Sequence, residues 1–237
     1  MKIIYRISDG SHKKDKLPNA TKQHCMENAC KVFSAADFRI LADNCAADTL
    51  QWLGRIGAPM ERTSLGNAGT FRFALKLATE SMTDEDIVYF LEDDYLHLPL
   101  APKAIEEGLT IADYVTLYDH PDKYWNRADG GPNPLVRHGG ERSRVLLTPS
   151  THWKLTNSTT MTFAARVRVL REDLPVWMRY TRRRIPNDFW AFRHLLWRRR
   201  WTSLFLREGR RLVSPIPALA THAELAYLAP LVDWSCV

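Results

Sequence analysis

Apolar residues in the first half of the chain follow two alternating patterns. Short, nearly continuous apolar runs predict strands at residues 2–7, 38–42, 87–91 and 114–118. Mixed apolar and polar stretches predict helices at residues 19–33, around 49–53, at 69–79 and at 102–109. Parallel strands need crossover connections, which helices commonly provide. The alternation therefore predicts an α/β sandwich with a mostly parallel central sheet and flanking helices.

The pattern changes after residue 118. Residues 119–140 are rich in Pro, Gly, Asn and Asp, which predicts a long loop of a kind that is often functional in compact domains. Beyond it we expect strands at 144–147 and 159–163, helices at 166–180 and 189–201, and irregular chain after the proline-containing stretch 214–217. Asn187 or Asp188 could cap the second of these helices.

Composition places the chain among globular proteins. Its 237 residues, 45% of them hydrophobic, suit one domain with a substantial core. The chain contains no run of eighteen apolar residues, so we expect no membrane-spanning helix. The apolar residues at its start are interrupted too early for a secretory signal. The four cysteines lack the spacing of a disulfide framework or a zinc site, which favours reduced thiols and a cytoplasmic location.

The positive charge is concentrated late in the chain. Residues 166–211 hold fourteen arginines and four acids, a net charge of +10, so the rest of the chain carries −4 although the whole is +6. Such a segment suggests an anionic partner, for example a phosphate, a lipid head group or a nucleic acid. A solvated helical surface explains the same charge without any partner.

Three adjacent acids follow the most apolar predicted strand. Residues 87–91 read Ile-Val-Tyr-Phe-Leu and lead directly into Glu92, Asp93 and Asp94. Ligands of open α/β sheets bind beyond the carboxyl ends of the strands. Carboxylates crowded there repel one another unless a cation compensates them, and Mg²⁺ or Mn²⁺ suits such oxygen ligands. The alternative is a solvated acidic turn.

This strand and its acids resemble the D-x-D motif of GT-A-fold glycosyltransferases, in particular a family-2-like member. Further short motifs follow in the order that this family has. The resemblance implies a GT-A-like, Rossmann-type sandwich that binds a UDP-, GDP- or dTDP-linked sugar. It assigns donor binding to Ser8, Asp9, Asn44, Gly66, Asn67, Glu92 and Asp93. Residues 1–118 would form the nucleotide-sugar-binding half of one domain, and residues 119–237 the acceptor half and C-terminal tail.

The resemblance also implies a catalytic assignment. Asp188 matches the acid that serves as base, and Asp94 and His222 match the residues that hold Mn²⁺ or Mg²⁺. Direct attack on the sugar would invert its anomeric configuration. The chain departs from the family pattern at Glu92, which replaces an aspartate, and at Asn187, which replaces a glutamate.

Each assignment has a simpler alternative. Asp188 could only cap a helix, His222 could be an ordinary histidine, and Gly66 could only shape a turn. His97 could join the metal site or contact the acceptor, and the 119–120 pair, Asp-His, could line the acceptor pocket.

Two other functions fit the same sequence features. A nucleotidyltransferase acting on a sugar phosphate would use a similar sheet and acidic site, but its basic, glycine-rich loop after the first strand is only faintly matched at residues 9–14. A non-catalytic module could bind an anionic partner through the basic segment alone. For a glycosyltransferase, that segment fits a lipid-linked phosphate, a polysaccharide or DNA as acceptor, and it would allow peripheral attachment at the inner membrane surface.

Overall fold

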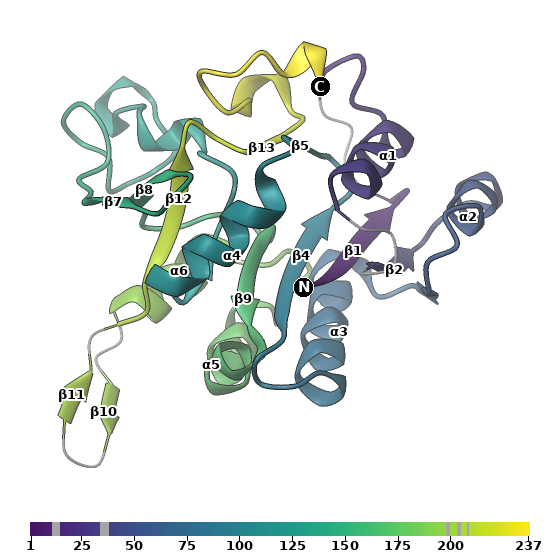
Figure 1. Cartoon of the computed structure of the whole chain (residues 1–237), viewed down its shortest axis with the longest axis horizontal. Helices are drawn as coiled ribbons and strands as arrows, with labels where there is room; N and C mark the ends of the chain where they lie inside the picture. Colours follow the sequence, from purple (N-terminus) through teal and green to yellow (C-terminus); the bar gives the residue numbers. More distant parts are fainter. Residues whose placement is uncertain (11–14, 34–37, 198–199, 203–204, 208) are drawn as a thin grey trace.

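The computed structural model describes residues 1–10, 15–33, 38–197, 200–202, 205–207 and 209–237. Its centre is a nine-stranded sheet with the order β3-β2-β1-β4-β9-β6-β12-β8-β7 (Figure 1). The strands are β1 (Lys2–Ser8), β2 (Phe38–Asp43), β3 (Met60–Thr63), β4 (Ile87–Glu92), β6 (Tyr114–Val115), β7 (Val145–Leu147), β8 (His152–Leu155), β9 (Phe163–Arg166) and β12 (Leu212–Ile216). Strands β3, β2, β1 and β4 are parallel, whereas β9, β8 and β7 add antiparallel pairs.

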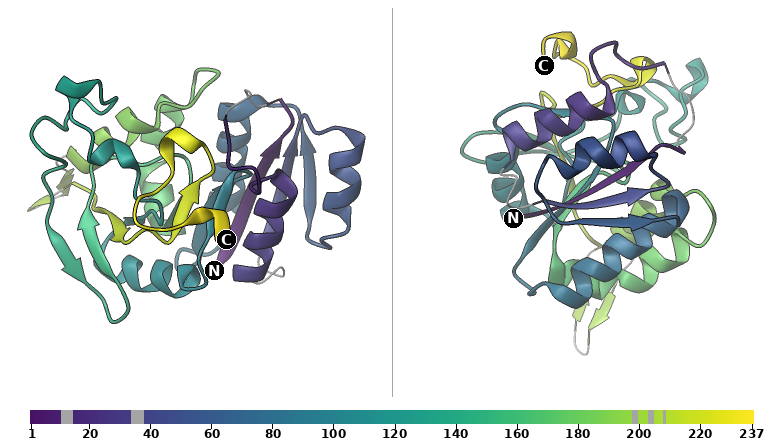
Figure 2. Two further views of the ribbon diagram at one scale, coloured as in Figure 1. Left: turned by 90° about the horizontal axis from the view of Figure 1, so that it is seen from above. Right: turned by 90° about the vertical axis from the view of Figure 1, so that its right-hand side faces the viewer.

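Helices cover both faces of this sheet. One core joins it to α1 (Lys22–Val32), α2 (Ala47–Gly54) and α4 (Ala101–Ile111). The other joins it to α3 (Gly66–Ser81), α5 (Val167–Tyr180) and α6 (Asp188–Trp197). The edge-on view on the right of Figure 2 shows the sheet between these layers. The predicted α/β sandwich with flanking helices is therefore confirmed.

Burial on both faces explains the apolar strands. Residues 3–5 of β1 and residues 88–91 of β4 are fully buried, as expected for parallel strands covered by helices on each side. Arg6 interrupts the apolar sequence of β1 and is only 5% exposed, which is unusual for an arginine. Its charge is balanced by Glu92, which lies opposite it on β4.

Two small sheets complete the fold. Strand β5 (Tyr95–His97) pairs with β13 (Ala220–His222) and brings the end of the chain against the residues that follow β4. The hairpin of β10 (Arg200–Thr202) and β11 (Phe205–Arg207) projects from the body beyond α6 (Figure 1). The described residues include no helix with both the length and the apolar character needed to cross a membrane.

Several predictions for the second half were wrong. The strand expected at 159–163 lies instead at Phe163–Arg166, because 159–162 turn back over the sheet edge with hydroxyls bonded to other side chains. The helix expected at 189–201 ends at Trp197, and residues 200–202 are extended; positions 198–199 are outside the described residues. The tail expected to be irregular supplies the strand β13, where His222 pairs with Tyr95 of β5. Tertiary pairing, which local sequence does not reveal, decides these segments.

Candidate active site

A cavity of about 500 Å³ opens at the carboxyl ends of β1, β2 and β4. This is the edge where ligands of open α/β sheets bind. Eight of the residues predicted for donor and metal binding line it: Ser8, Asn44, Gly66, Asn67, Glu92, Asp93, Asp94 and His222. The exception is Asp9, whose carboxylate accepts hydrogen bonds from Lys22 Nζ at 2.8 Å and from the Ala46 N–H at 2.8 Å. Asp9 therefore holds the rim of the cavity together instead of lining it.

Glu92 is tied to the buried arginine of β1. Arg6 faces Glu92 in the register of the two strands, and its Nη2 donates to Glu92 Oε1 at 2.7 Å. Its Nη1 donates to the backbone oxygen of Asn67 at 3.1 Å. The guanidinium group also lies 5.1 Å from the centre of the Phe71 ring. Glu92, Arg6 and Asn67 thus form one polar floor, and the longer side chain of glutamate spans the distance between the strands.

Asp43 shapes the loop that opens α3. Its carboxylate accepts from the N–H groups of Leu65 (2.6 Å) and Gly66 (3.0 Å) and from Thr63 Oγ1 (2.8 Å). Burial alone would raise the pKa of Asp43, but these hydrogen bonds outweigh it and lower that pKa. Gly66 has φ +71°, a conformation that glycine adopts without strain. Gly66 therefore shapes the turn before α3 and also lines the cavity.

We expect Asp43→Ala to lower the free energy of unfolding by about 3 kcal/mol, because it leaves several donors without their charged acceptor. The loss should be complete above pH 3.8, the ordinary aspartate pKa, and should shrink as pH falls through the lowered pKa of the folded state. Urea unfolding at several pH values measures it, with the exposed Glu106→Ala as control. An equal loss in the two variants, or a pH-independent loss, would contradict this role.

The last two acids of the triplet lie deeper in the cavity. Asp93 Oδ2 accepts from the Ser8 N–H at 3.1 Å, and burial together with the charge of Asp94 raises the pKa of Asp93. Asp94 Oδ2 lies 3.1 Å from His222 Nε2 and 3.1 Å from Lys16 Nζ. Strand β13 therefore delivers His222 to Asp94, the pair that the sequence predicted as metal ligands.

The donors at Asp94 fit a hard divalent cation only in part. No group of three or more His, Cys, Asp or Glu side chains arranged for a metal occurs within the described part of the chain. One carboxylate and one imidazole nevertheless suit Mg²⁺ or Mn²⁺, because these ions commonly complete their coordination with substrate phosphates and water. Lys16 contacts the same carboxylate oxygen, so a cation and Lys16 would compete for it.

Asp188 begins α6, but it does not cap it. Asn187 Oδ1 accepts from the Trp190 N–H at 3.3 Å, so the cap is Asn187. Partial burial raises the pKa of Asp188 to about 6; a hydrogen bond from the Phe189 N–H opposes this shift and the nearby charge of Glu92 adds to it. The charge of Lys123 also acts on Asp188. Asp188 thus lies close enough to both Glu92 and Lys123 for their charges to act on it.

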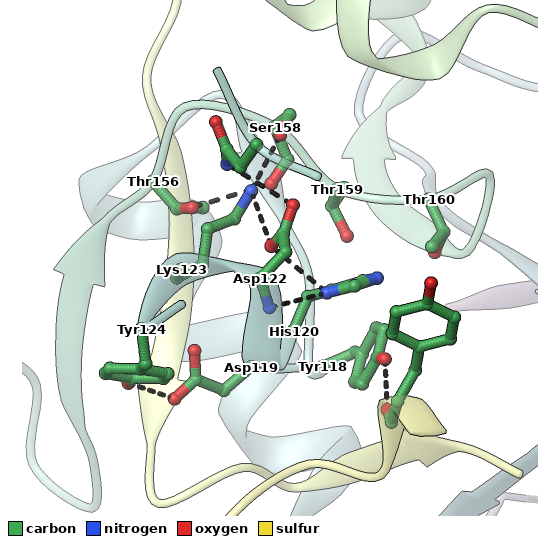
Figure 3. Close-up of polar contacts among 12 residues, drawn as sticks. Tyr118, Asp119, His120, Asp122, Lys123, Tyr124, Thr156, Ser158, Thr159 and Thr160 are labelled. Carbon is green, nitrogen blue, oxygen red and sulfur yellow. Dashed lines mark hydrogen bonds and ion pairs between the residues drawn. The ribbon is translucent and has the colours of Figure 1, made fainter. Parts of the chain in front are cut away.

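A buried polar cluster surrounds Lys123 (Figure 3). Lys123, 2% exposed, donates to Ser158 Oγ at 2.7 Å and to Asn157 Oδ1 at 3.1 Å. Asp122 Oδ1 lies 3.3 Å from Lys123 Nζ and 3.0 Å from His120 Nδ1. These contacts fix the start of the long 119–140 loop against the 156–160 segment, so the loop is held by buried charges.

Aromatic rings connect His120 to the acidic site. The Tyr118 ring lies 5.0 Å from that of His120 and 6.5 Å from that of His222. Asp119, which the sequence prediction paired with His120, is 2% exposed and bonds Lys154 Nζ at 2.7 Å. Of that pair, only His120 is partly exposed, with 20% of its side chain accessible.

His97 is part of the core. It is 1% exposed, its Nε2 lies 2.9 Å from the Tyr89 hydroxyl, and burial lowers its pKa to about 3. The prediction that it joins the metal site or contacts the acceptor is therefore wrong. Its position three residues after Asp94 put it on β5, facing the α1 side of the sheet.

Sequence reasoning overlooked the basic residues of the site. Arg6 and Arg184 line the cavity, and Lys16 and Lys22 approach Asp94 and Asp93. An arginine inside an otherwise apolar strand could have indicated Arg6. Arg184 and Lys16 come from loops whose place depends on the tertiary fold, so no local signal identifies them.

Comparison with known proteins supports the fold. No protein-family model matches the chain, and no curated protein does. Among solved structures, GalNAc-T7 with UDP, GalNAc and Mn²⁺ superposes with a TM-score of 0.55 at 9% identity, over 93% of this chain and 43% of that one. This chain thus spans less than half of the length of GalNAc-T7.

Two other solved structures overlap less well. The galactosyltransferase LgtC, in complex with donor and acceptor sugar analogues, gives a TM-score of 0.45 at 11% identity, over 82% of this chain and 69% of that one. HddC from Yersinia pseudotuberculosis gives a TM-score of 0.48 at 9% identity, over 94% of this chain and 93% of that one. We base the fold assignment on the match to GalNAc-T7 together with the sheet order. The protein has a GT-A-like glycosyltransferase fold.

Proposed function

We propose that this protein is a glycosyltransferase that transfers a sugar from a nucleoside-diphosphate sugar to an acceptor, with inversion. The observation that carries the proposal is the cavity at the carboxyl ends of β1, β2 and β4, where Glu92, Asp93 and Asp94 meet His222 within a GT-A-like fold. Its volume of about 500 Å³ suits a small-molecule ligand.

The polar groups of the cavity divide between the two ends of such a donor. Asn44 and Asn67 offer amide groups to a nucleoside, at the end formed by β2 and α3. Arg184, exposed at the rim, offers a guanidinium group that suits a diphosphate. Arg6 and Glu92 hold each other, so they present a fixed surface to the donor.

Asp94 and His222 would hold a divalent cation, and Asp93 lies beside them. Bound there, Mn²⁺ or Mg²⁺ would neutralise the charge that develops on the departing diphosphate. The contribution of the chain is to keep Asp94 Oδ2 and His222 Nε2 within 3.1 Å of each other through the β13–β5 pairing.

Asp188 is the residue that would accept the proton of the acceptor hydroxyl. A carboxylate with a pKa of about 6 is ionised at neutral pH and yet binds a proton more strongly than an ordinary aspartate. Both properties suit a general base. His120, held by Asp122 on the other side of the pocket, would orient the acceptor.

A ligand-stabilisation screen tests the donor site. We expect UDP or GDP with Mn²⁺ to raise the melting temperature of the protein, since a ligand that binds only the folded state stabilises it. Nucleotide or Mn²⁺ alone should have a smaller effect, and EDTA should remove the added gain. Identical melting curves with every nucleotide tested would contradict a nucleotide-sugar site.

The products of a positive reaction identify the chemistry. Incubation with UDP- or GDP-sugars and Mn²⁺ should release the nucleoside diphosphate and the free sugar, because water can replace the acceptor. Formation of a nucleotide-sugar with release of pyrophosphate from a nucleoside triphosphate and a sugar phosphate would instead identify a nucleotidyltransferase.

A further inference from the structure

A basic cavity of about 610 Å³ lies apart from the donor site. It is bounded by the end of α6, the start of β12, the end of β8 and residues 135–142, and none of its lining residues belongs to the donor cavity. A second hollow of about 650 Å³ shares Arg142, Leu196 and Arg211 with it. The two hollows therefore adjoin each other.

The lining is strongly cationic. It includes Arg137, Arg142, Arg193, Arg210 and Arg211. Arg210 is neutralised inside the protein, since it bonds Asp173 at 2.8 Å, Glu172 at 2.6 Å and Asp113 at 3.0 Å. Within the ranges that the structure describes, Arg137, Arg142 and Arg193 pair with no carboxylate.

Glu141, the acid in the lining, does not offset these arginines. Its carboxylate accepts from the Asn157 N–H at 2.6 Å and from Thr156 Oγ1 at 2.9 Å. Burial raises the pKa of Glu141, and its carboxylate also lies 3.9 Å from Lys154 Nζ. Among the described residues, the acid of the lining is therefore engaged inside the protein, and Arg137, Arg142 and Arg193 keep their positive charge for a ligand.

Arg193 is stacked on an exposed indole. Its Cζ lies 3.3 Å from the centre of the Trp197 ring, and Trp197 is 69% exposed. Partial burial lowers the pKa of Arg193, a cost that a bound anion would relieve. An arginine fixed by stacking keeps its donors oriented for a planar carboxylate or a phosphate.

Other arginines of the basic segment are neutralised internally. Arg166 and Arg168 pair with Glu85, and Arg171 pairs with Asp84. The net charge of +10 at residues 166–211 thus overstates the free charge of that segment. Among the described arginines of the segment that pair with no acid, Arg193 lines this cavity, where Arg137 and Arg142 join it from outside the segment.

Helix α6 links this cavity to the proposed base. Asp188 is its first residue and Trp197 its last, so the two lie about 14 Å apart along the helix axis. Asn157, which lines the cavity, also bonds Lys123, whose charge acts on Asp188. A chain-like acceptor with its reactive hydroxyl at Asp188 could therefore reach the cavity with a later unit.

We propose that this cavity binds an anionic saccharide, as the distal part of the acceptor whose hydroxyl reacts beside Asp188; the acceptor role rests on the proposed glycosyltransferase function. The recess favours a saccharide over a membrane, because a lipid surface contacts protruding rather than hollowed faces. Three unpaired arginines in one recess, Arg193 of α6 with Arg137 and Arg142, also suit a short anionic segment better than a long nucleic-acid backbone, which needs a cationic track.

Direct binding tests this proposal without donor or metal, so it can fail or succeed independently of the transferase assignment. The probes are fluorescently labelled tetragalacturonate, phosphorylated maltotetraose, neutral maltotetraose and an oligothymidine of matched charge. We expect at least one anionic saccharide to bind more tightly than neutral maltotetraose, and Arg142→Gln/Arg193→Gln to weaken that binding about tenfold or more. Arg55→Gln, an exposed substitution on another surface, should leave it unchanged.

The opposite results would overturn the proposal. These are no binding of either anionic saccharide, equal binding of neutral maltotetraose, equal loss in Arg55→Gln, or full binding by the double variant. Tighter binding of the oligothymidine than of both anionic saccharides would assign the cavity to a nucleic acid. Thermal unfolding of each variant verifies that it is folded, and Arg142→Gln alone replaces the double variant if that one is not.

Discussion

Asp94→Asn should lower donor hydrolysis and sugar transfer about a hundredfold or more while the protein stays folded. Asp94 and His222 are the two side chains that would hold the cation, and an amide oxygen without charge is a much weaker ligand for it. The fold should survive, because the substitution also removes the repulsion between Asp94 and Asp93. Initial rates at several Mn²⁺ concentrations measure the loss, which added Mn²⁺ should partly restore.

A substitution of Lys16 separates a metal-assisted reaction from one assisted by the lysine itself. Its amine lies 3.1 Å from the same Asp94 oxygen, so it could itself supply the positive charge for a departing diphosphate. In a metal-assisted enzyme, Lys16→Met should retain Mn²⁺-dependent activity, and Glu106→Gln, exposed on α4, should behave as wild type. Activity that resists EDTA and disappears in Lys16→Met would refute the metal assignment, as would full Mn²⁺-dependent activity in Asp94→Asn.

The sequence predicted that Ser8, Asn44 and Glu92 lie together because each lies at or next to the end of a strand. Ser8 ends β1, Asn44 follows β2 and Glu92 ends β4, and parallel strands bring their carboxyl ends to one edge. The apolar runs that mark these strands are long enough to be read locally. Position along the chain therefore determined position in space.

The contacts that depend on the second half of the chain could not be predicted in the same way. His222 was placed by resemblance alone, since the tail that carries it was expected to be irregular and is in fact β13, paired with β5. The Lys123 cluster joins residues more than thirty positions apart through side chains buried by the fold, as in its bond to Ser158. Periodicity gives no sign of such contacts, because they depend on how β6, β9 and β12 assemble.

Paired charges also limit what composition can reveal. The count of arginines in residues 166–211 predicted a partner for the whole segment, yet Arg168 and Arg171 are neutralised by acids near residue 85. A net charge per segment does not include ion pairs with distant residues. Only the folded arrangement identifies Arg142 and Arg193 as neighbours on one unpaired surface.

Asp188→Asn should reduce kcat by about 10²- to 10⁴-fold with little change in nucleotide affinity, as expected for loss of a general base. The same variant should melt at a higher temperature than wild type at pH 7.5. Folding raises the pKa of Asp188 to about 6, so ionisation of this carboxylate opposes folding above that pH. The stability gain should disappear below pH 3.8, where the carboxyl group is protonated in both folded and unfolded chains.

Asn187→Ala separates the base from the helix cap. Asn187 accepts from the Trp190 N–H, so its loss should lower stability by about 1 kcal/mol and leave kcat much less affected than Asp188→Asn does. In wild type, kcat/KM should fall with pH below about 6 as Asp188 takes up its proton. If Asn187→Ala and Asp188→Asn lost activity equally, or if Asp188→Asn kept the wild-type pH profile, Asp188 would be a structural residue of α6 and another group would have to accept the proton.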